Sequence, residues 1–496
     1  MPARRTTFLA ACAAPLLAAC AAPLLAACAA TSLAATPLGA TTSTAPTVVV
    51  PAAAATTTLT PADLARAVFA RMTTAQRVGQ LFMVGGPATG LGAATQSAIT
   101  RYHVGSLVLT GRTTNGTAPV RALTAHADAL TTSAATAGVP LFIAADQEGG
   151  FVQVLQGPGF SRMPTALTQG SWSDATLTAN ATRWGWQVLR SGVDLDLAPV
   201  MDTVSRSFAA SNLPIGYYQR EYGYTPSVVA EKGTSFQRGL QVSGLATTPK
   251  HFPGLGRVRG NTDTSAGVTD TVTTRTSADL VPFRAALAAH ARVLMVSSAY
   301  YRRIDPAHPA VFSPTVIGGM IRHDLGFTGI VVSDDLGNAR QVTAWTPGAR
   351  AVYFIAAGGD VVLTVNPTVV PAMVQAVASR AATDGAFRAK VDAAVLRVLT
   401  VKAEDGLLAP RPPVDGVLRA STVVALQRWL AITRTGVFDT ATIRALQARI
   451  GMSVVGIWGP RSTATMQTYL GIARDGASYW NARTVAQLQR YLATQL

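Results

Sequence analysis

Eight short apolar runs with strong β-propensity recur along the middle of the chain. Between them lie Ala- and Leu-rich stretches in which apolar positions repeat with the period of a helix. The runs are nearly continuous in apolar character, as strands buried on both faces of a parallel sheet are. This alternation over residues 59–406 predicts a (β/α)8 TIM-type barrel. The predicted strands are residues 78–84, 104–110, 139–145, 193–199, 245–251, 293–298, 329–333 and 360–365. The first helix is predicted to begin with Thr60 as N-cap and Pro61 in its first turn.

A second pattern follows a proline-rich linker, residues 407–421. Four similar units recur, and each begins with a Leu-Gln or Met-Gln pair, at Gln427, Gln447, Gln467 and Gln489. In three positions an aromatic residue (Phe438, Trp458, Trp480) is followed four residues later by Thr or Ser (Thr442, Ser462, Thr484). Each unit reads as a loop, a cap and a short helix, so residues 422–496 are predicted to form a small all-α repeat domain.

This repeat resembles the peptidoglycan-binding domains at the ends of cell-wall hydrolases. The resemblance implies peptidoglycan, and with it the cell wall, as a partner. From Arg411 onward ten arginines face three aspartates, a net charge of +7, which suits anionic wall polymers. The alternative is a solvated basic surface with no such partner.

The amino terminus has the composition of a secretion signal over residues 1–30, with Arg4 and Arg5 before an apolar stretch. Each of its cysteines ends a Leu-Ala-Ala-Cys tetrapeptide, which resembles the bacterial lipoprotein lipobox. The resemblance implies a lipid on Cys20, or on Cys28, and a membrane contact through that lipid. The alternatives are plain secretion and an uncleaved membrane anchor. Residues 31–58, almost only Ala, Thr, Pro, Ser and Val, are predicted to be a flexible linker. We therefore expect an extracytoplasmic protein, lipid-anchored or secreted, at the cell wall.

The amino-acid composition limits the kinds of site and partner that the chain is expected to have. All three cysteines precede residue 30, so no disulfide or thiolate metal site is expected in the folded part. His, Asp and Glu show no metal-ligand spacing, and we expect no metal and no cofactor. The formal charge of +16 raises the question of nucleic acid, but no basic run is interleaved with aromatic residues. An anionic cell envelope is the better partner for this charge.

The candidate catalytic and ligand-binding residues follow two of the predicted strands. Lys250 and His251 follow the fifth predicted strand, and together they donate and accept hydrogen bonds as a ligand rich in hydroxyls requires. Asp334 and Asp335 follow the seventh. A carboxylate that leaves a buried strand into a cleft can act as the nucleophile of a retaining glycosidase. Alternatively, both acids cap the following helix.

Five motifs in order resemble family 3 glycoside hydrolases, in particular the bacterial β-N-acetylhexosaminidase branch. They lie within residues 60–405, and their sequences are Gly79-Gln80-Leu81-Phe82-Met83-Val84-Gly85, Asp146-Gln147-Glu148-Gly149-Gly150, Leu197-Ala198-Pro199-Val200-Met201-Asp202, Lys250-His251-Phe252-Pro253-Gly254 and Ser333-Asp334-Asp335-Leu336. The resemblance implies that Asp334 attacks the anomeric carbon to form a covalent glycosyl-enzyme. It also implies a carbohydrate substrate whose hydroxyls are held by Asp146, Lys250, His251 and, by a looser alignment, Arg220. For Arg220 the alternative is a surface ion pair with Glu221 or a neighbour.

Three departures from the family pattern bear on activity. The loop after the Pro-Gly motif keeps the aspartate, as Asp263, but has Ser265 where the family has its general acid/base histidine. Phe151 and Val154 stand where the family usually has arginines, and the sixth strand ends Ser297-Ser298 where a histidine is common.

Loss of a general acid costs about 10²–10⁴-fold in rate, so three hypotheses follow. Asp263 serves as the acid if its pKa is raised. Another carboxyl, from Glu221 or a mobile loop, enters the site. Or the barrel is catalytically impaired and retained as a wall-binding lipoprotein. The first two describe a retaining glycosidase acting on β-linked sugars or amino sugars of the wall.

Overall fold

The computed structural model describes residues 60–408, 414–430 and 432–495. The predicted secretion signal, its cysteines Cys20 and Cys28, the flexible linker 31–58 and part of the linker 407–421 lie outside these residues. The described residues contain two separate hydrophobic clusters, one within residues 65–407 and the other within residues 425–492. No described helix combines the length and the apolar character that crossing a membrane requires.

All eight predicted runs overlap a strand of the parallel sheets, and all but the first contain the whole strand. The strands are β1 Phe82–Pro87, β2 Ser106–Thr110, β3 Phe142–Ala145, β6 Leu195–Asp196, β7 Ala246–Thr247, β9 Val293–Val296, β12 Ile330–Ser333 and β13 Val362–Thr364. The first prediction was wrong at its start, because Val78 to Gln80 end helix α2 (Thr74–Gln80). A continuous apolar run cannot by itself separate the end of a buried helix from the beginning of a buried strand.

Six strands form one parallel sheet in the order β13-β1-β2-β3-β6-β7, and β9 and β12 form a second parallel pair. Single parallel bridges link the two sheets, Phe252 with Val296 on one side and Val332 with Val361 on the other. Strands β6 and β7 are only two residues long, and Pro199 and Pro249 beyond them have no N–H to donate to a ladder. The fold is therefore α/β with parallel strands, and its regular ladders stop short of a closed barrel.

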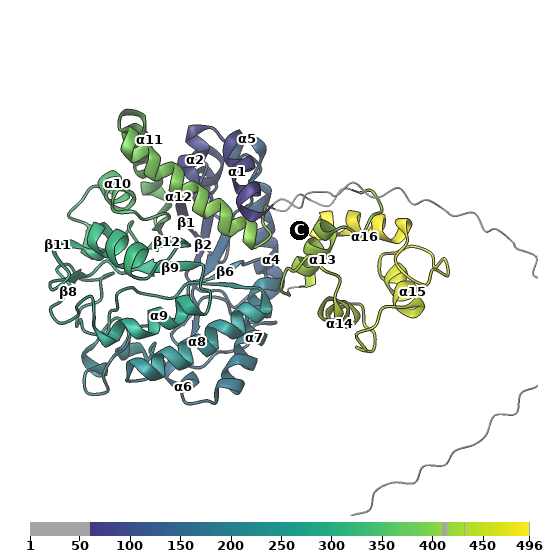
Figure 1. Cartoon of the computed structure of the whole chain (residues 1–496), viewed down its shortest axis with the longest axis horizontal. Coiled ribbons are helices and arrows are strands. Elements are labelled where there is room, and N and C mark those ends of the chain that lie inside the picture. Colours follow the sequence, from purple (N-terminus) through teal and green to yellow (C-terminus); the bar gives the residue numbers. More distant parts are fainter. Residues whose placement is uncertain (1–59, 409–413, 431, 496) are drawn as a thin grey trace, which may run out of the picture. The chain divides into compact units, whose positions relative to one another are not determined.

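Helices surround these strands, as Figure 1 shows for the part of the chain coloured purple to green. They are α1 Pro61–Arg71, α2 Thr74–Gln80, α3 Ala93–Arg101, α4 Thr117–Ala129, α5 Ser133–Thr136, α6 Ala166–Gln169, α7 Asp174–Arg190, α8 Pro226–Ser243, α9 Val281–Ala288, α10 Pro347–Ala357, α11 Val370–Thr383 and α12 Gly385–Glu404. A π-helix spans Thr315–Asp324. The predicted start of α1 is confirmed: Thr60 accepts from the Asp63 amide and Asp63 closes a capping box.

Three short strands form a small sheet beside the parallel strands, and two more form a hairpin directly after β3. The small sheet joins β8 Thr269–Asp270, β10 Tyr300–Tyr301 and β11 Asp305–Pro309, and the hairpin joins β4 Gln147–Gly149 and β5 Val152–Gln153. The hairpin matters for function because it carries Glu148 and the turn residue Phe151.

Lys402 of α12 closes the amino-terminal edge of the parallel strands. Its side chain is fully buried, and its ammonium group donates to Gln80 Oε1 at 2.9 Å, to the carbonyl of Gly105 at 2.7 Å and to that of Pro140 at 2.9 Å. Burial lowers the pKa of Lys402 to about 7, and its charged form is tolerated because each of its protons has an acceptor. Because Lys402 fills this edge, a site can form at the opposite edge, where the strands have their carboxyl ends.

The carboxy-terminal repeats fold as α13 Ala420–Leu430, α14 Thr440–Arg449, α15 Pro460–Tyr469 and α16 Ala482–Gln495. Helix α13 begins inside the segment assigned to the linker, two residues before the predicted boundary at 422. The recurring glutamines are buried, and each one binds a loop: Gln427 binds Gly436 and Val437, Gln447 binds Gly456 and Ile457, and Gln467 binds Asp475.

The fourth glutamine, Gln489, connects the last unit to the segment before the first one. Gln489 Oε1 accepts from the amides of Asp415 and Gly416, both at 3.0 Å, and its Nε2 donates to the Val417 carbonyl. The four units therefore close on themselves. At their centre the Trp458 and Trp480 rings stack with centroids 4.7 Å apart, and Phe438 packs edge-on against both.

Candidate active site

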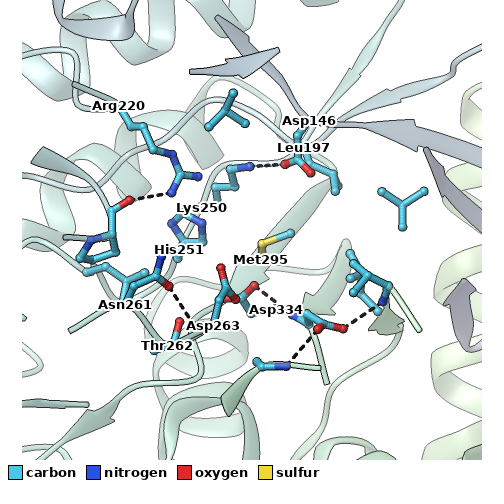
Figure 2. A pocket seen from close by; sticks show the side chains of 18 of the residues that line it. Asp146, Leu197, Arg220, Lys250, His251, Asn261, Thr262, Asp263, Met295 and Asp334 are labelled. Carbon is cyan, nitrogen blue, oxygen red and sulfur yellow. Dashed lines mark hydrogen bonds and ion pairs between the residues drawn. The ribbon is translucent and has the colours of Figure 1, made fainter. Parts of the chain in front are cut away.

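A cavity of about 720 Å³ opens at the carboxyl ends of the parallel strands. Asp146 enters it one residue after β3, and Lys250 and His251 enter it after β7. Asp334 enters it directly after β12, as Figure 2 shows. Arg220 and Asp263 line it from loops. The structure therefore brings together all six predicted catalytic and substrate-binding residues, which lie as far apart in the sequence as Asp146 and Asp334.

One side of the cavity is a buried network of ions. Lys250 Nζ lies 2.5 Å from Asp146 Oδ1 and 2.7 Å from Glu148 Oε1. Arg220 donates to both oxygens of Glu148, at 2.7 and 2.8 Å. The side chain of Lys250 is 2% exposed and that of Arg220 15% exposed. The alternative of a surface ion pair between Arg220 and Glu221 was therefore wrong, because Arg220 pairs with a buried carboxylate.

The opposite charges within this network shift the pKa values of its members. Burial alone would raise the pKa of Glu148, but Arg220 and Lys250 outweigh it and lower the pKa to about 2. Burial opposes the charge on Lys250, whereas Asp146 and Glu148 raise its pKa. Glu148 and Lys250 are thus both charged at neutral pH. The network presents Asp146, one-third exposed, and cations to whatever occupies the cavity.

His251 is held in one orientation. Its Nδ1 donates to Asp202 Oδ2 at 2.7 Å, and Asp202 Oδ1 accepts from the Leu255 amide at 2.7 Å. Asp202 is completely buried. A hydrogen bond at Nδ1 leaves Nε2 as the ring atom available to a ligand.

The two acids after β12 have different environments. Asp335 accepts hydrogen bonds from the amides of Gly337, Asn338, Ala339 and Val365, at 2.8 to 3.1 Å. Burial raises the pKa of Asp335. Asp334 accepts one amide hydrogen bond, from Asp335 at 2.9 Å, and lines the cavity. Asp335 therefore caps the loop, and Asp334 is the carboxylate that remains available to bind a ligand.

Asp263 lies on a loop that is fixed to the segment after β12. Its carbonyl accepts from the Arg340 amide at 3.0 Å, and the Thr262 carbonyl accepts from the Gln341 amide at 3.0 Å. The surrounding protein, followed by the charges of Asp334 and Asp335, raises the pKa of Asp263 to about 6. The Asp263 side chain lines the cavity and is exposed to solvent there. Asp263 and Asp334 lie at the end of the cavity opposite Arg220 (Figure 2), and Asp335 also lines the cavity.

Glu221 and Ser265 lie apart from this arrangement, since neither lines the cavity. Glu221 is completely buried and has no ion-pair partner among the described residues. Burial, followed by the charge of Asp202, raises its pKa to about 7. The hypothesis that Glu221 supplies the acid would require the loop that carries it to rearrange.

Sequence reasoning missed five residues of the site. Glu148 and Asp202 lie within the motifs that resemble the family, but only the structure shows that they fix Arg220, Lys250 and His251. Arg112, Phe151 and Tyr218 also line the cavity. Arg112 had a local signal, because it lies two residues beyond the end of β2, and Phe151 had one in the position where the family usually has an arginine. Tyr218 lies on a loop whose course the sequence did not reveal.

The chain was compared with known proteins. The glycosyl hydrolase family 3 N-terminal domain matches residues 73–401. A β-hexosaminidase of Stenotrophomonas maltophilia (strain K279a) is 35% identical over 283 residues, which cover 55% of this chain and 80% of that protein.

Two solved structures are also similar. The β-N-acetylhexosaminidase of Beutenbergia cavernae DSM 12333 is 49% identical with a TM-score of 0.66, and the match covers 67% of this chain and 99% of that one. A family 3 β-N-acetylglucosaminidase from Paenibacillus sp. str. FPU-7 is 28% identical with a TM-score of 0.62, covering 68% and 64%. The chain described here therefore belongs to glycosyl hydrolase family 3 and is a glycosidase that hydrolyses O-glycosyl bonds.

Proposed function

We propose that this protein is a retaining glycoside hydrolase that removes β-linked amino sugars from cell-wall polymers through a covalent glycosyl-aspartate intermediate. The observation that carries the proposal is the position of Asp334, free in the same cavity as Lys250 and His251. The names of the relatives, β-hexosaminidases and β-N-acetylglucosaminidases, support a β-linked amino sugar as the substrate.

The ionised network would hold one sugar ring. Asp146 accepts hydrogen bonds from hydroxyls, while Lys250 and Arg220 donate to hydroxyl oxygens. His251 Nε2 supplies a further polar contact from a ring whose orientation Asp202 fixes. Because each of these side chains is already held by protein partners, little orientation remains to be lost when a sugar binds.

Asp334 would attack the anomeric carbon as the bond to the departing oxygen breaks. Asp263, in its acid form, would give its proton to that oxygen. In the second step the Asp263 carboxylate would take a proton from water as the water displaces Asp334, which restores both groups. The raised pKa of Asp263 supports this assignment, because a carboxyl with an ordinary pKa is almost wholly ionised at neutral pH.

We infer that the two parallel sheets together form one (β/α)8 ring. The bridges between Phe252 and Val296 and between Val332 and Val361 support this, since they link the sheets at both junctions. In such a ring the carboxyl ends of the strands converge on one rim, where Asp146, Lys250 and Asp334 stand.

We also infer that the repeat domain holds the enzyme at peptidoglycan and that a lipid on Cys20 or Cys28 ties the secreted chain to the membrane. The net charge of +7 from Arg411 onward supports a wall partner. So does one exposed apolar side chain at the equivalent position of each unit: Val417, Val437, Ile457 and Tyr479. Exposed apolar groups on a domain with a net positive charge suit a polymer that carries acetyl groups and carboxylates.

The test of the catalytic proposal is hydrolysis of a coloured aryl β-N-acetylglucosaminide. Asp334→Asn should abolish turnover, whereas Asp174→Asn, which removes the same charge from an ion pair at the start of α7, should leave turnover unchanged. Trapping of a glycosyl group on Asp334 with a slow substrate, seen by mass spectrometry of the peptide, would establish the retaining route. Turnover that survives in Asp334→Asn would exclude Asp334 as nucleophile.

The second candidate function, a wall-binding lipoprotein with an impaired barrel, is favoured by the absence of the family histidine at Ser265. It predicts no turnover of any aryl glycoside and undiminished sedimentation with purified walls. Removal of residues 411–496 should abolish sedimentation under either function. Unchanged sedimentation of the truncated protein would contradict the wall-binding role of the repeats.

A further inference from the structure

The loop that carries Asp263, residues 254–268, is fixed at its start by a buried side-chain amide. Asn212 is completely buried, and its Nδ2 donates to the carbonyls of Leu255 and Val258, at 2.8 and 2.7 Å. Asn212 lies on the segment between β6 and α8. The first half of the loop is therefore tied to a neighbouring segment by two hydrogen bonds from one side chain.

The second half of the loop is fixed by Gln341, which stands in the 3₁₀ turn Arg340–Val342 after β12. The Gln341 side chain is buried, at 4% exposed. Its Oε1 accepts from the Val268 amide at 2.9 Å, and its Nε2 donates to the Val268 carbonyl at 3.1 Å. The backbone amide of Gln341 donates to the Thr262 carbonyl at 3.0 Å. A single residue thus bonds the loop on both sides of Asp263.

Gln341 connects two carboxyls that come from different parts of the chain. It follows Asp334 by seven residues, and it bonds the loop that carries Asp263. Both carboxyls line the cavity, whereas Gln341 does not. A retaining glycosidase needs its two carboxyls about 5 Å apart, and a misplacement of about 1 Å can cost 10²-fold in rate. A side chain that ties the loop of one carboxyl to the segment of the other therefore sets their separation.

The pKa of Asp263 depends on the same placement. The surrounding protein, followed by the charges of Asp334 and Asp335, raises the pKa of Asp263. The charges of His251 and Arg220 lower it, and the result is a pKa of about 6. If the loop moves away from the segment after β12, the two carboxylates lose their effect on Asp263. Its pKa then falls toward the ordinary value for an aspartate, about 3.9.

We propose that Gln341 is a positioning residue, which holds Asp263 at the same end of the cavity as Asp334 so that the acid is in place before the sugar binds. This rests on the proposed function, in which Asp263 gives its proton to the departing oxygen. Gln341 acts through the loop and touches neither the sugar nor the reacting atoms. No movement of the loop is then needed to deliver the acid.

The test compares two leaving groups through kcat/KM, which reports the step that forms the glycosyl-enzyme. Methyl β-N-acetylglucosaminide needs a proton on its departing oxygen, whereas the 2,4-dinitrophenyl glycoside does not. Gln341→Ala should lower kcat/KM for the methyl glycoside roughly 10- to 100-fold, because the acid is misplaced. It should leave kcat/KM for the dinitrophenyl glycoside unchanged. Equal losses with both substrates, or no loss with either, would overturn the proposal.

Two further variants separate positioning from stability. Gln341→Leu fills most of the same space without either hydrogen bond, so it should show the same selective loss and serves if Gln341→Ala fails to fold. Gln237→Ala is the matched control, because Gln237 is also a completely buried glutamine that bonds the backbone. Its Nε2 donates to the carbonyls of Ala286 and Ala289, both at 2.9 Å, and it does not line the cavity. Gln237→Ala should leave the ratio of the two kcat/KM values unchanged.

A titration of Asp263 keeps the proposal testable if turnover is absent. Carbon NMR of carboxyl-labelled aspartates gives the pKa of Asp263, and Asp263→Asn identifies its signal. This pKa should fall from about 6 toward about 4 in Gln341→Ala and stay unchanged in Gln237→Ala. No turnover by the unaltered protein combined with this fall would reject the proposed function and retain Gln341 as the residue that places Asp263. An Asp263 pKa that is the same with and without the Gln341 side chain would overturn the proposal.

Discussion

Glu148 receives two hydrogen bonds from Arg220, at 2.7 and 2.8 Å, and its Oε1 also lies 2.7 Å from Lys250 Nζ. One fully buried carboxylate thereby balances two cations at the floor of the cavity. Removal of one member of a buried ion pair leaves an uncompensated charge, which costs more than the pair itself contributes.

Glu148→Gln should therefore destabilise the protein by about 3–5 kcal/mol at pH 7, because it leaves Arg220 and Lys250 without their shared partner. The folded pKa of Glu148, about 2, lies below its ordinary value, so its contribution is complete above about pH 4.3 and is lost as the pH falls toward 2. Urea unfolding of both proteins at pH 7 and at pH 3 measures this. The difference between them should shrink at pH 3, and a difference that grows with acid would contradict the assignment.

Asp263→Asn should lower kcat for a substrate with a poor leaving group by about 10²–10⁴-fold, the usual contribution of a general acid. The unaltered enzyme needs Asp263 protonated, so its kcat should fall as the pH rises through about 6. The variant should lose this alkaline limb. Profiles of kcat against pH from 4 to 8 test both statements.

Ser265→Ala is the matched control, because Ser265 lies on the same loop and does not line the cavity. It should keep both the rate and the alkaline limb. If instead Ser265→Ala is as slow as Asp263→Asn, the loop acts through its conformation and Asp263 is not the acid.

Asp202→Asn should weaken sugar binding roughly 10- to 100-fold, the effect of losing one buried hydrogen bond to a charged group. An asparagine amide facing His251 donates to Nδ1, so the ring must carry its proton on Nε2 and present the opposite tautomer to the ligand. Nitrogen chemical shifts of His251 report the tautomer directly, and calorimetry reports the affinity. An unchanged tautomer combined with unchanged affinity would show that Asp202 serves only to hold the Leu255 amide.

The position of each strand was predictable because strands buried on both faces leave apolar runs that need no knowledge of the rest of the chain. The start of the first run was misread, since Val78 is as apolar at the end of α2 as it would be in a strand. The convergence of Lys250 and Asp334 on one cavity followed from parallel strands whose carboxyl ends share an edge.

The partners within the site were not predictable in the same way. Glu148 and Arg220 are separated by 71 intervening residues, and only folding shows that they pair. Only the family resemblance singled out Asp334; the residues alone could not separate it from Asp335, because the difference lies in where four backbone amides point. Phe151 and Tyr218, which line the cavity, have no periodic signal either, since they stand on turns outside the strands and the longer helices.

Gln489 should hold the repeat domain closed, and its removal should open the first and last units. Its side chain is completely buried and accepts from the amides of Asp415 and Gly416, which Gln489→Ala would leave without this partner. The Val417 carbonyl, to which Gln489 Nε2 donates, keeps the Arg419 amide as a donor. Each unsatisfied buried group costs about 1–3 kcal/mol. Hydrogen exchange of the full-length protein should then accelerate in residues 414–430 and in α16, while the parallel-sheet region keeps its protection. Gln487→Ala is the control on the same helix, since its two long contacts contribute little: it donates to the Leu470 carbonyl and accepts from Arg490, both at 3.4 Å. Equal acceleration in both variants would mean that α16 frays for any loss of side chain, and that the four units are not closed through Gln489.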